Sequence, residues 1–262
     1  MKKLVLAGLL FALLPLAAIA QSGFDGTWKI DLKTAQLPTK PDVLLLQNGM
    51  YECKTCVPPI NVKADGQDQK ITGQPYYNSV SIKVVNDRTV EETDKKDGKV
   101  VVKSTTKVAA DGKTATFDFT DSSDSNSSPV TGKGVMTRVA AGPAGSSPIS
   151  GSWRTSKLDA VSDNALMLTF KVEGDSLSMT NPTGQSYTAK LDGTAAPMKG
   201  DPGVTTVSVK RISKSTIEET DLRHGKPIGV THMTVSADGK TMTFVMQNKL
   251  SGNTTKATAM KQ

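Results

Sequence analysis

The residues of this chain best placed to recognise a ligand are acidic ones that occur twice. The tetrapeptide Glu-Glu-Thr-Asp stands at residues 91–94 and again at residues 218–221. Successive side chains of a strand point to opposite faces, so Val90, Glu92 and Asp94 share one face, and Glu219 shares a face with Ile217. If these faces line the interior of a barrel, the carboxylates of Glu92 and Glu219 can hydrogen-bond a polar group inside it.

Burying a carboxylate costs free energy, and this cost favours a second interpretation in which Glu92 is exposed. A charged group inside a protein is unfavourable unless it is paired or hydrated. The sequence therefore favours an exposed Glu92, near the barrel rim or at a bulge, with the tetrapeptide serving the turn that follows it. A polar lumen that uses Glu92 and Glu219 to bind a ligand is the alternative.

The only two cysteines, Cys53 and Cys56, are separated by two residues. In an oxidising compartment two such cysteines most often form a structural disulfide. A redox-active dithiol is the alternative, but it normally needs a helix N-terminus or cationic neighbours to lower the thiol pKa. Metal binding is the third alternative, and a zinc site would need further ligands.

The remaining chemistry-bearing residues indicate no catalytic site. His232 alternates with Met233 and is predicted to face solvent, and His224 is predicted to lie on a turn. The chain has no zinc-protease, nucleophile-elbow or phosphate-loop motif. We therefore predict no enzyme activity, no cofactor and no bound metal.

The chain repeats itself over a domain-sized period. Residues 80–121 and 207–248 align without a gap and match at eighteen of forty-two positions. A repeat of this length predicts two copies of one domain. The predicted boundaries are a signal peptide at 1–20, a first repeat at 21–139, a Gly/Ala/Ser/Pro linker at 140–148 and a second repeat at 149–262.

The N-terminal residues are typical of an export signal. Lys2 and Lys3 precede an apolar run over residues 4–14, and small residues lead to Ala20. This pattern predicts cleavage after Ala20 and a periplasmic or secreted protein. The run is shorter than the roughly 20 apolar residues of a transmembrane helix, so no membrane-spanning segment is predicted.

Charge and aromatic content disfavour a nucleic-acid partner. The net charge of the chain is +7, but its lysines and arginines are scattered singly and aromatic residues are few. A nucleic-acid surface would need a basic stripe with stacking aromatics.

Short strands joined by tight turns account for the whole mature chain. Turn pairs such as Asn48-Gly49, Asp65-Gly66 and Asp111-Gly112 recur, and no stretch has a helical apolar period. Asn-Gly predicts a type I′ hairpin turn, which needs positive φ at both residues. The pattern predicts an all-β protein with two antiparallel up-and-down barrels of about eight strands each.

The start and end of each repeat resemble those of lipocalin-like (calycin-type) β-barrels. Gly26-Thr27-Trp28 and Gly151-Ser152-Trp153 open the repeats, and Arg138 and Lys261 lie in their last strands. The resemblance implies that the tryptophan of each barrel closes its floor and that the cation near the end of the same barrel lies across the indole. It also implies a small apolar ligand.

Two residues of the second repeat are candidate ligand contacts. Met242 and Phe244 share one face of a predicted strand. Adaptable side chains suit an apolar cavity, but they equally fill irregular cores, and core filling is favoured.

We therefore expect an exported, non-catalytic protein that binds a small apolar or amphipathic ligand in a barrel lumen. One alternative is a structural or interaction module of the cell envelope whose barrels are filled by their own side chains. A second alternative is a thiol–disulfide redox protein that uses Cys53 and Cys56. A cavity of about 300 Å³ or more would favour the binding protein.

Overall fold

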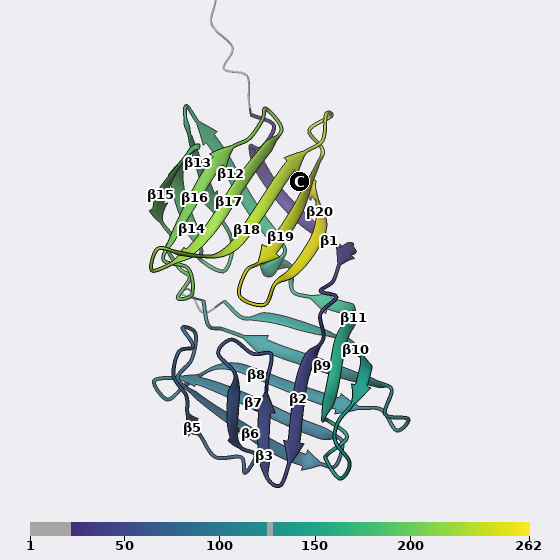
Figure 1. The fold of residues 1–262 in the computed structure, drawn as a ribbon. Coiled ribbons are helices and arrows are strands. Elements are labelled where there is room, and N and C mark those ends of the chain that lie inside the picture. Colours follow the sequence, from purple (N-terminus) through teal and green to yellow (C-terminus); the bar gives the residue numbers. More distant parts are fainter. Residues whose placement is uncertain (1–21, 125–127) are drawn as a thin grey trace, which may run out of the picture.

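The computed structural model describes residues 22–124 and 128–262, so the predicted signal peptide lies outside the described residues. These residues form two ten-stranded antiparallel sheets, each curled into a nearly closed barrel (Figure 1). The one helical element among them is a single 3-10 turn, η1 (Asp163–Ala165). The all-β prediction is confirmed, but each barrel has ten strands rather than about eight.

The first barrel is built from strands β2–β11, which follow one another along the chain. Its strand order is β4-β3-β2-β11-β10-β9-β8-β7-β6-β5. The bounds are β2 (Asp42–Gln47), β3 (Met50–Cys53), β4 (Ile60–Lys63), β5 (Gln69–Lys70), β6 (Ser79–Asn86), β7 (Thr89–Lys96), β8 (Lys99–Val108), β9 (Thr114–Asp121), β10 (Val130–Ala141) and β11 (Gly151–Val161).

The second barrel is built from β1 and β12–β20. Its strand order is β14-β13-β12-β1-β20-β19-β18-β17-β16-β15. The bounds are β1 (Gly26–Gln36), β12 (Met167–Glu173), β13 (Ser176–Thr180), β14 (Ser186–Lys190), β15 (Asp192–Pro197), β16 (Thr206–Arg211), β17 (Thr216–Arg223), β18 (Lys226–Val235), β19 (Thr241–Asn248) and β20 (Asn253–Lys261).

The first strand of each sequence repeat lies in the barrel that the other repeat forms. Strand β1 pairs with β12 and β20, with Trp28 opposite Lys261. Strand β11 pairs with β10 and β2, with Trp153 opposite Arg138 and Asp42. The prediction that residues 21–139 and 149–262 each close around their own first strand is therefore wrong.

Local pairing explains the exchange. Strands that are adjacent in sequence usually pair in space, and β11 follows β10 as a long antiparallel hairpin from Gly132↔Val161 to Ala141↔Gly151. A sequence repeat identifies equivalent strands, but it does not say which copy of a strand joins which barrel.

The segment predicted as a linker is part of the first barrel. The Ser147 N–H donates to the Leu46 carbonyl (2.9 Å), and the Leu46 N–H donates to Ser150 Oγ (2.8 Å). Ile149 and Ser150, which follow the segment, are 2% and 1% exposed. Residues 140–148 therefore connect β10 to β11 within one barrel and do not separate the two barrels.

The chain passes between the barrels twice. Residues 37–41 lead from β1 to β2, and residues 162–166 lead from β11 to β12. The first barrel is thus one continuous segment inserted between β1 and the rest of the second barrel, and Figure 1 shows the two barrels one above the other.

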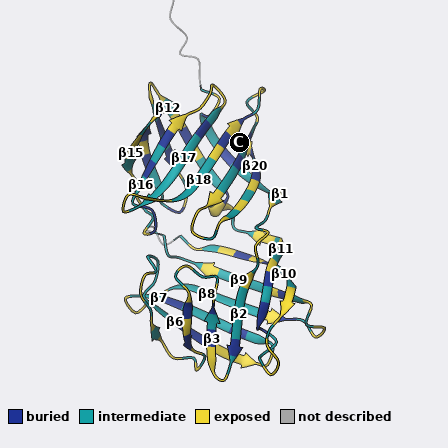
Figure 2. Ribbon diagram, in the orientation of Figure 1, coloured by how far each residue is buried: buried dark blue, intermediate teal, exposed yellow. Residues whose placement is uncertain are grey.

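Each barrel has its own apolar core, and a tryptophan lies at one end of it. Trp28 and Trp153 are 0% and 1% exposed. Each indole Nε1 donates to the carbonyl four residues earlier, Phe24 O (2.9 Å) and Ile149 O (2.8 Å). Figure 2 shows buried residues alternating with exposed ones along the strands. This pattern is typical of strands with one face toward a core.

Arg138 and Lys261 each lie across a tryptophan, as expected. In each case the tryptophan belongs to the other sequence repeat. Arg138 lies 4.0 Å from the centroid of the Trp153 ring, and Lys261 lies 5.2 Å from that of Trp28. The Arg138 guanidinium also donates to the carbonyls of Gly112, Pro148 and Ser150. The cation–tryptophan stacking implied by the lipocalin resemblance is present within each barrel, but the strand exchange crosses the repeats.

The Asn48-Gly49 hairpin has the predicted geometry. Asn48 has φ 55° and Gly49 has φ 74°, so both central residues of the turn between β2 and β3 take the positive φ of a type I′ turn.

Candidate functional site

Two acidic side chains of β7 point into the first barrel. Glu92 and Asp94 share the inner face with Val90, and they lie opposite Ile82 and Val80 of β6. Both apolar partners are 0% exposed, and Asp94 is 4% exposed. The favoured expectation of an exposed Glu92 is therefore wrong. The physical reason is its position, since β7 pairs regularly with β6 and β8 at Glu92, and the register shifts lie on either side of it, between Val84 and Asn86 and between Asp94 and Lys95.

Burial changes the titration of this pair. Desolvation raises the pKa of Glu92 to about 7. Desolvation raises the pKa of Asp94 to about 8, with repulsion from Glu92 and Asp121 adding to the shift. Two interacting carboxyl groups with such pKa values hold a proton between them near neutral pH.

Two tyrosines face the same pair. Burial raises the pKa of the Tyr51 phenol well above its ordinary value, and the nearby carboxylates Glu92 and Asp94 add to the shift. Burial raises the Tyr77 pKa in the same way, and repulsion from the charges of Asp94 and Glu92 adds to the shift. None of the groups that shift these four pKa values is cationic, and the next lysine along this face, Lys96, donates from its Nζ to the Pro75 carbonyl (3.2 Å).

One oxygen of this pair is unsatisfied. Asp94 Oδ1 is buried and has no hydrogen-bond partner in the part of the chain that the structure describes. An unmade hydrogen bond of a buried polar group costs about 1–3 kcal/mol, more for a charged one. Glu92 keeps some accessible surface although it points into the barrel. Glu92 therefore offers accessible surface inside the barrel, two residues along the same face from the unpartnered Asp94 oxygen.

The second barrel repeats this arrangement on β17. Glu219 and Asp221 point inward, and desolvation raises the Glu219 pKa to about 7 and the Asp221 pKa to about 6. The Tyr187 hydroxyl from β14 donates to Glu219 Oε2, which opposes that rise. Asp221 packs over Gly229, where an added Cβ would lie 2.9 Å from Asp221 Oδ2. The pair is thus partly satisfied by the protein itself.

A cavity of about 490 Å³ lies at the end of the second barrel that is remote from Trp28. Its walls include Asp221 and the apolar side chains Ile228, Met246 and Leu250, and Tyr76 reaches it from the first barrel. The cavity therefore combines apolar walls with an inner carboxyl group, the composition expected of a small-molecule site.

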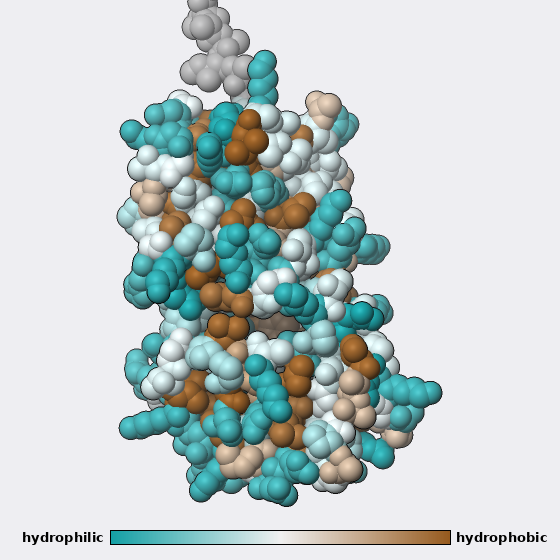
Figure 3. All heavy atoms as spheres, in the orientation of Figure 1, coloured by the Kyte–Doolittle hydropathy of each residue, from teal (hydrophilic) through white to brown (hydrophobic). Residues whose placement is uncertain are grey.

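A larger cavity, of about 760 Å³, lies elsewhere. It lies between β1 and β11 and does not include the inward carboxyl pairs. Its charged groups largely pair with each other, as Lys29 does with Asp163 (2.8 Å) and Lys157 with Asp159 (2.6 Å). Figure 3 shows the surface hollowed where the barrels meet. We base the candidate site on the carboxyl pairs, because size alone does not select a ligand.

Loops from the two barrels contact each other beside these sites. The Tyr76 hydroxyl donates to Asp201 Oδ1 (3.0 Å), and Gln185 Nε2 donates to Asp201 Oδ2 (3.1 Å) and Asp124 Oδ1 (3.4 Å). Tyr76 also closes over Gly203, where an added Cβ would lie 2.1 Å from the tyrosine oxygen. These contacts join the two barrels at the ends that are remote from Trp153 and Trp28.

Other predicted site residues belong to the core. Met242 is 0% exposed and Phe244 is 3% exposed, and both lie in the apolar core of the second barrel. Met246, two residues further along the same face, lines the 490 Å³ cavity.

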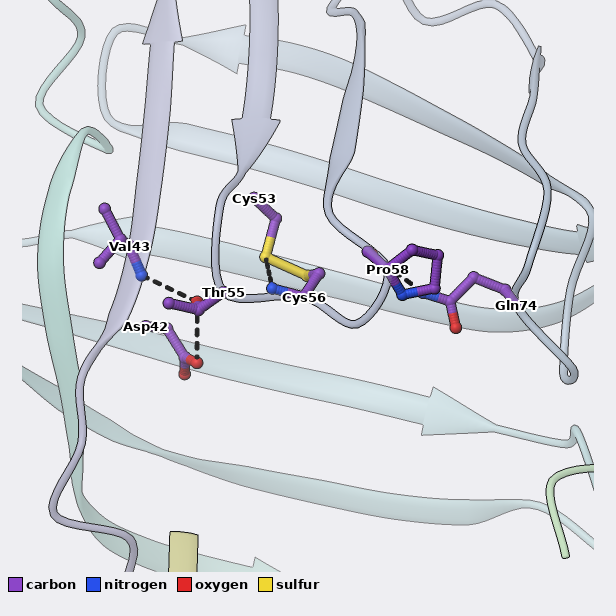
Figure 4. Close-up of a disulfide and its surroundings, with 7 residues drawn as sticks. All are labelled: Asp42, Val43, Cys53, Thr55, Cys56, Pro58 and Gln74. Carbon is purple, nitrogen blue, oxygen red and sulfur yellow. Dashed lines mark hydrogen bonds between the residues drawn. A yellow bond between two sulfur atoms is a disulfide. The ribbon is translucent and has the colours of Figure 1, made fainter. Parts of the chain in front are cut away.

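The two cysteines form a disulfide at the end of β3 (Figure 4). Their sulfurs are 2.06 Å apart, and the Cys56 N–H donates to Cys53 Sγ (3.1 Å). Thr55, between them, accepts from the Val43 N–H (3.0 Å) and donates to Asp42 Oδ1 (3.4 Å). The bridge and Thr55 hold this turn against the start of β2, as expected of a structural disulfide.

The histidines lie outside both barrels. The His232 side chain is 48% exposed and lies 3.5 Å from Glu218, and His224 is in a turn with φ 50°. In residues 22–124 and 128–262 no three His, Cys, Asp or Glu side chains gather in a group that could hold a metal ion. No helix in these ranges is long and apolar enough to cross a membrane.

The sequence identified Glu92 and Glu219 as candidate ligand contacts and placed Asp94 on the face of Glu92, but it did not single out Asp94 or Asp221 as site residues. Asp94 and Asp221 follow by the period of two, which was the signal available for them. Tyr51, Tyr187 and Tyr76 come from distant strands and loops, and no local pattern indicates them. No family model matches this chain, and no curated protein is similar to it.

Proposed function

We propose that this is an exported, non-catalytic protein that binds a small apolar or amphipathic ligand in the lumen of a lipocalin-like barrel. The observation that carries the proposal is the acidic pair inside the first barrel, Glu92 and Asp94, with Asp94 Oδ1 unpartnered among the described residues. A protein rarely leaves such a group unsatisfied, so a site for a polar ligand atom explains its presence.

Two further features support this function. The pair recurs in the second barrel as Glu219 and Asp221, where the adjoining cavity of about 490 Å³ exceeds the roughly 300 Å³ of small-molecule sites. The basic, apolar and small residues of positions 1–20 support work in the periplasm or outside the cell.

The alternative of a structural module with filled barrels rests on the packing around the aromatic side chains. Met242 and Phe244 fill the second barrel, and Phe117 packs over Gly134, where an added Cβ would lie 2.8 Å from the ring. These contacts lie toward the tryptophan ends, whereas the carboxyl pairs lie toward the opposite ends. Both kinds of packing can therefore occur in one barrel.

Native mass spectrometry of the protein purified from its own cells tests the proposal. We expect a retained small molecule whose amount falls in Asp94→Asn. The matched control is Glu91→Gln, because Glu91 is the adjacent carboxylate on the outer face, 3.3 Å from Lys83. Bare polypeptide in every preparation, together with no binding of added amphipathic compounds, would favour the filled-barrel module.

A further inference from the structure

The chemical class of the ligand follows from what surrounds the Glu92–Asp94 pair. The groups that face it are Asp121 from β9, Tyr51 from β3 and Tyr77 from the loop before β6. All of them are acidic or neutral. Lys95 Nζ binds Asp68 (2.6 Å), and Lys96, which the period of two places on the face of Asp94, has its Nζ on the Pro75 carbonyl (3.2 Å).

We propose that the first barrel binds an organic cation, a primary ammonium group on an apolar chain, with the ammonium at Asp94 and Glu92. This inference rests on the proposed function and names the ligand class of the same site. An ammonium group offers three donors and no acceptor, which suits the unpartnered Asp94 Oδ1 beside a second carboxylate. A carboxylate or phosphate ligand would meet like charge there.

The walls of the lumen suit the rest of such a molecule. Val80, Ile82 and Val90 are buried in the core beside the two carboxyl groups, and the partly buried Phe117 offers apolar surface toward Trp153. Burying an alkyl chain against such walls yields about 0.8 kcal/mol per methylene group. The ligand is therefore an amphipathic amine rather than a free ammonium ion or a metal ion.

Binding is coupled to proton release. The pair holds a proton near neutral pH, and an incoming ammonium favours the fully ionised pair. The proton leaves to solvent as the ammonium takes its place, with no covalent change. The affinity for the amine therefore increases as the pH rises through the titration of Glu92 and Asp94, with Asp121, Tyr51 and Tyr77 as the other titratable groups facing them.

Isothermal titration calorimetry with three six-carbon probes tests this inference. We expect hexylammonium to bind at least tenfold more tightly than 1-hexanol and hexanoate, and its affinity to rise about tenfold from pH 6 to pH 8. Asp94→Asn should lower its affinity at least tenfold, and Glu91→Gln should leave it unchanged. Glu92→Gln serves as a second variant if Asp94→Asn does not fold, which circular dichroism would show.

The outcomes separate the ligand class from the proposed function. Equal binding of hexanol or hexanoate, or an affinity for hexylammonium that Asp94→Asn and Glu92→Gln both leave unchanged, would overturn the cation site and leave a binding protein of another class. If none of the three probes binds and no ligand is retained in the native protein, the binding function itself is overturned.

Discussion

Arg138 lies 4.0 Å from the ring centroid of Trp153, although these residues come from different sequence repeats. The contact follows from the exchange of β1 and β11 between the barrels. It makes residues 42–161, and not residues 21–139, the segment that contains a complete set of strands for one barrel.

The exchange predicts which fragment folds. A fragment of residues 42–161 contains all ten strands of the first barrel and one tryptophan, Trp153. We expect it to be folded, with dispersed amide signals in NMR spectra and the blue-shifted emission of a buried indole. A fragment of residues 21–139 lacks β11, and we expect it to be poorly folded.

The second fragment also provides the outcome that would refute this prediction. If residues 21–139 folded as stably as residues 42–161, with Trp28 buried in place of Trp153, either first strand could complete the barrel. The exchange would then not be determined by the sequence.

Replacement of the stacked cations should have unequal effects. Arg138 contacts three backbone carbonyls as well as the indole, so Arg138→Ala should lower the free energy of unfolding of the first barrel by about 2–4 kcal/mol. Lys261 lies further from its indole, at 5.2 Å, so Lys261→Ala should cost the second barrel about 1 kcal/mol or less. Urea unfolding followed by tryptophan fluorescence measures both losses of stability. Equal losses would show that the three carbonyl contacts of Arg138 add nothing to the stability of the first barrel.

The inward carboxyl groups predict a pH dependence of stability. Their pKa values are raised to between about 6 and about 8, while the unfolded chain releases the same protons near pH 4. The folded state therefore binds more protons across this window, and the free energy of unfolding falls as the pH rises from about 4 to 8. This stabilisation is complete below pH 4 and is lost above pH 8.

Replacing one pair should flatten this dependence in part. We expect the double variant Glu92→Gln, Asp94→Asn to reduce the loss between pH 5 and pH 8 by roughly 1–3 kcal/mol. Glu91→Gln is the control and should leave the slope unchanged. Urea midpoints at the two pH values measure the effect, and a wild-type stability that rises with pH would show that the pairs are already ionised.

The disulfide should be structural, and its contribution to the free energy of unfolding should be small. Cys53 and Cys56 close a loop of only a few residues, so replacing both with serine should lower stability by about 2 kcal/mol or less. We expect the bridge to resist mild reductant in the folded protein, because the Cys53 side chain is buried. Rapid reduction under native conditions, with turnover of a disulfide substrate, would instead support the thiol–disulfide alternative.

The sequence predicted local features well because they depend on neighbouring residues. Asn48-Gly49 determined its own turn, the period of two placed Glu92 and Asp94 on one face, and the spacing of Cys53 and Cys56 suited a disulfide. The exchange of β1 and β11 could not be predicted, because both tryptophan strands match the same place in a barrel. The contacts of Tyr187 with Glu219 and of Tyr76 with Asp201 depend on that tertiary arrangement, so no local pattern contains them.

A crystal structure of the protein with bound hexylammonium tests the central claim most directly. We predict the ammonium nitrogen in the first barrel at about 3 Å from Asp94 Oδ1, with the alkyl chain against Phe117. Hexylammonium bound only in the cavity between β1 and β11, with no ligand inside the first barrel, would contradict it.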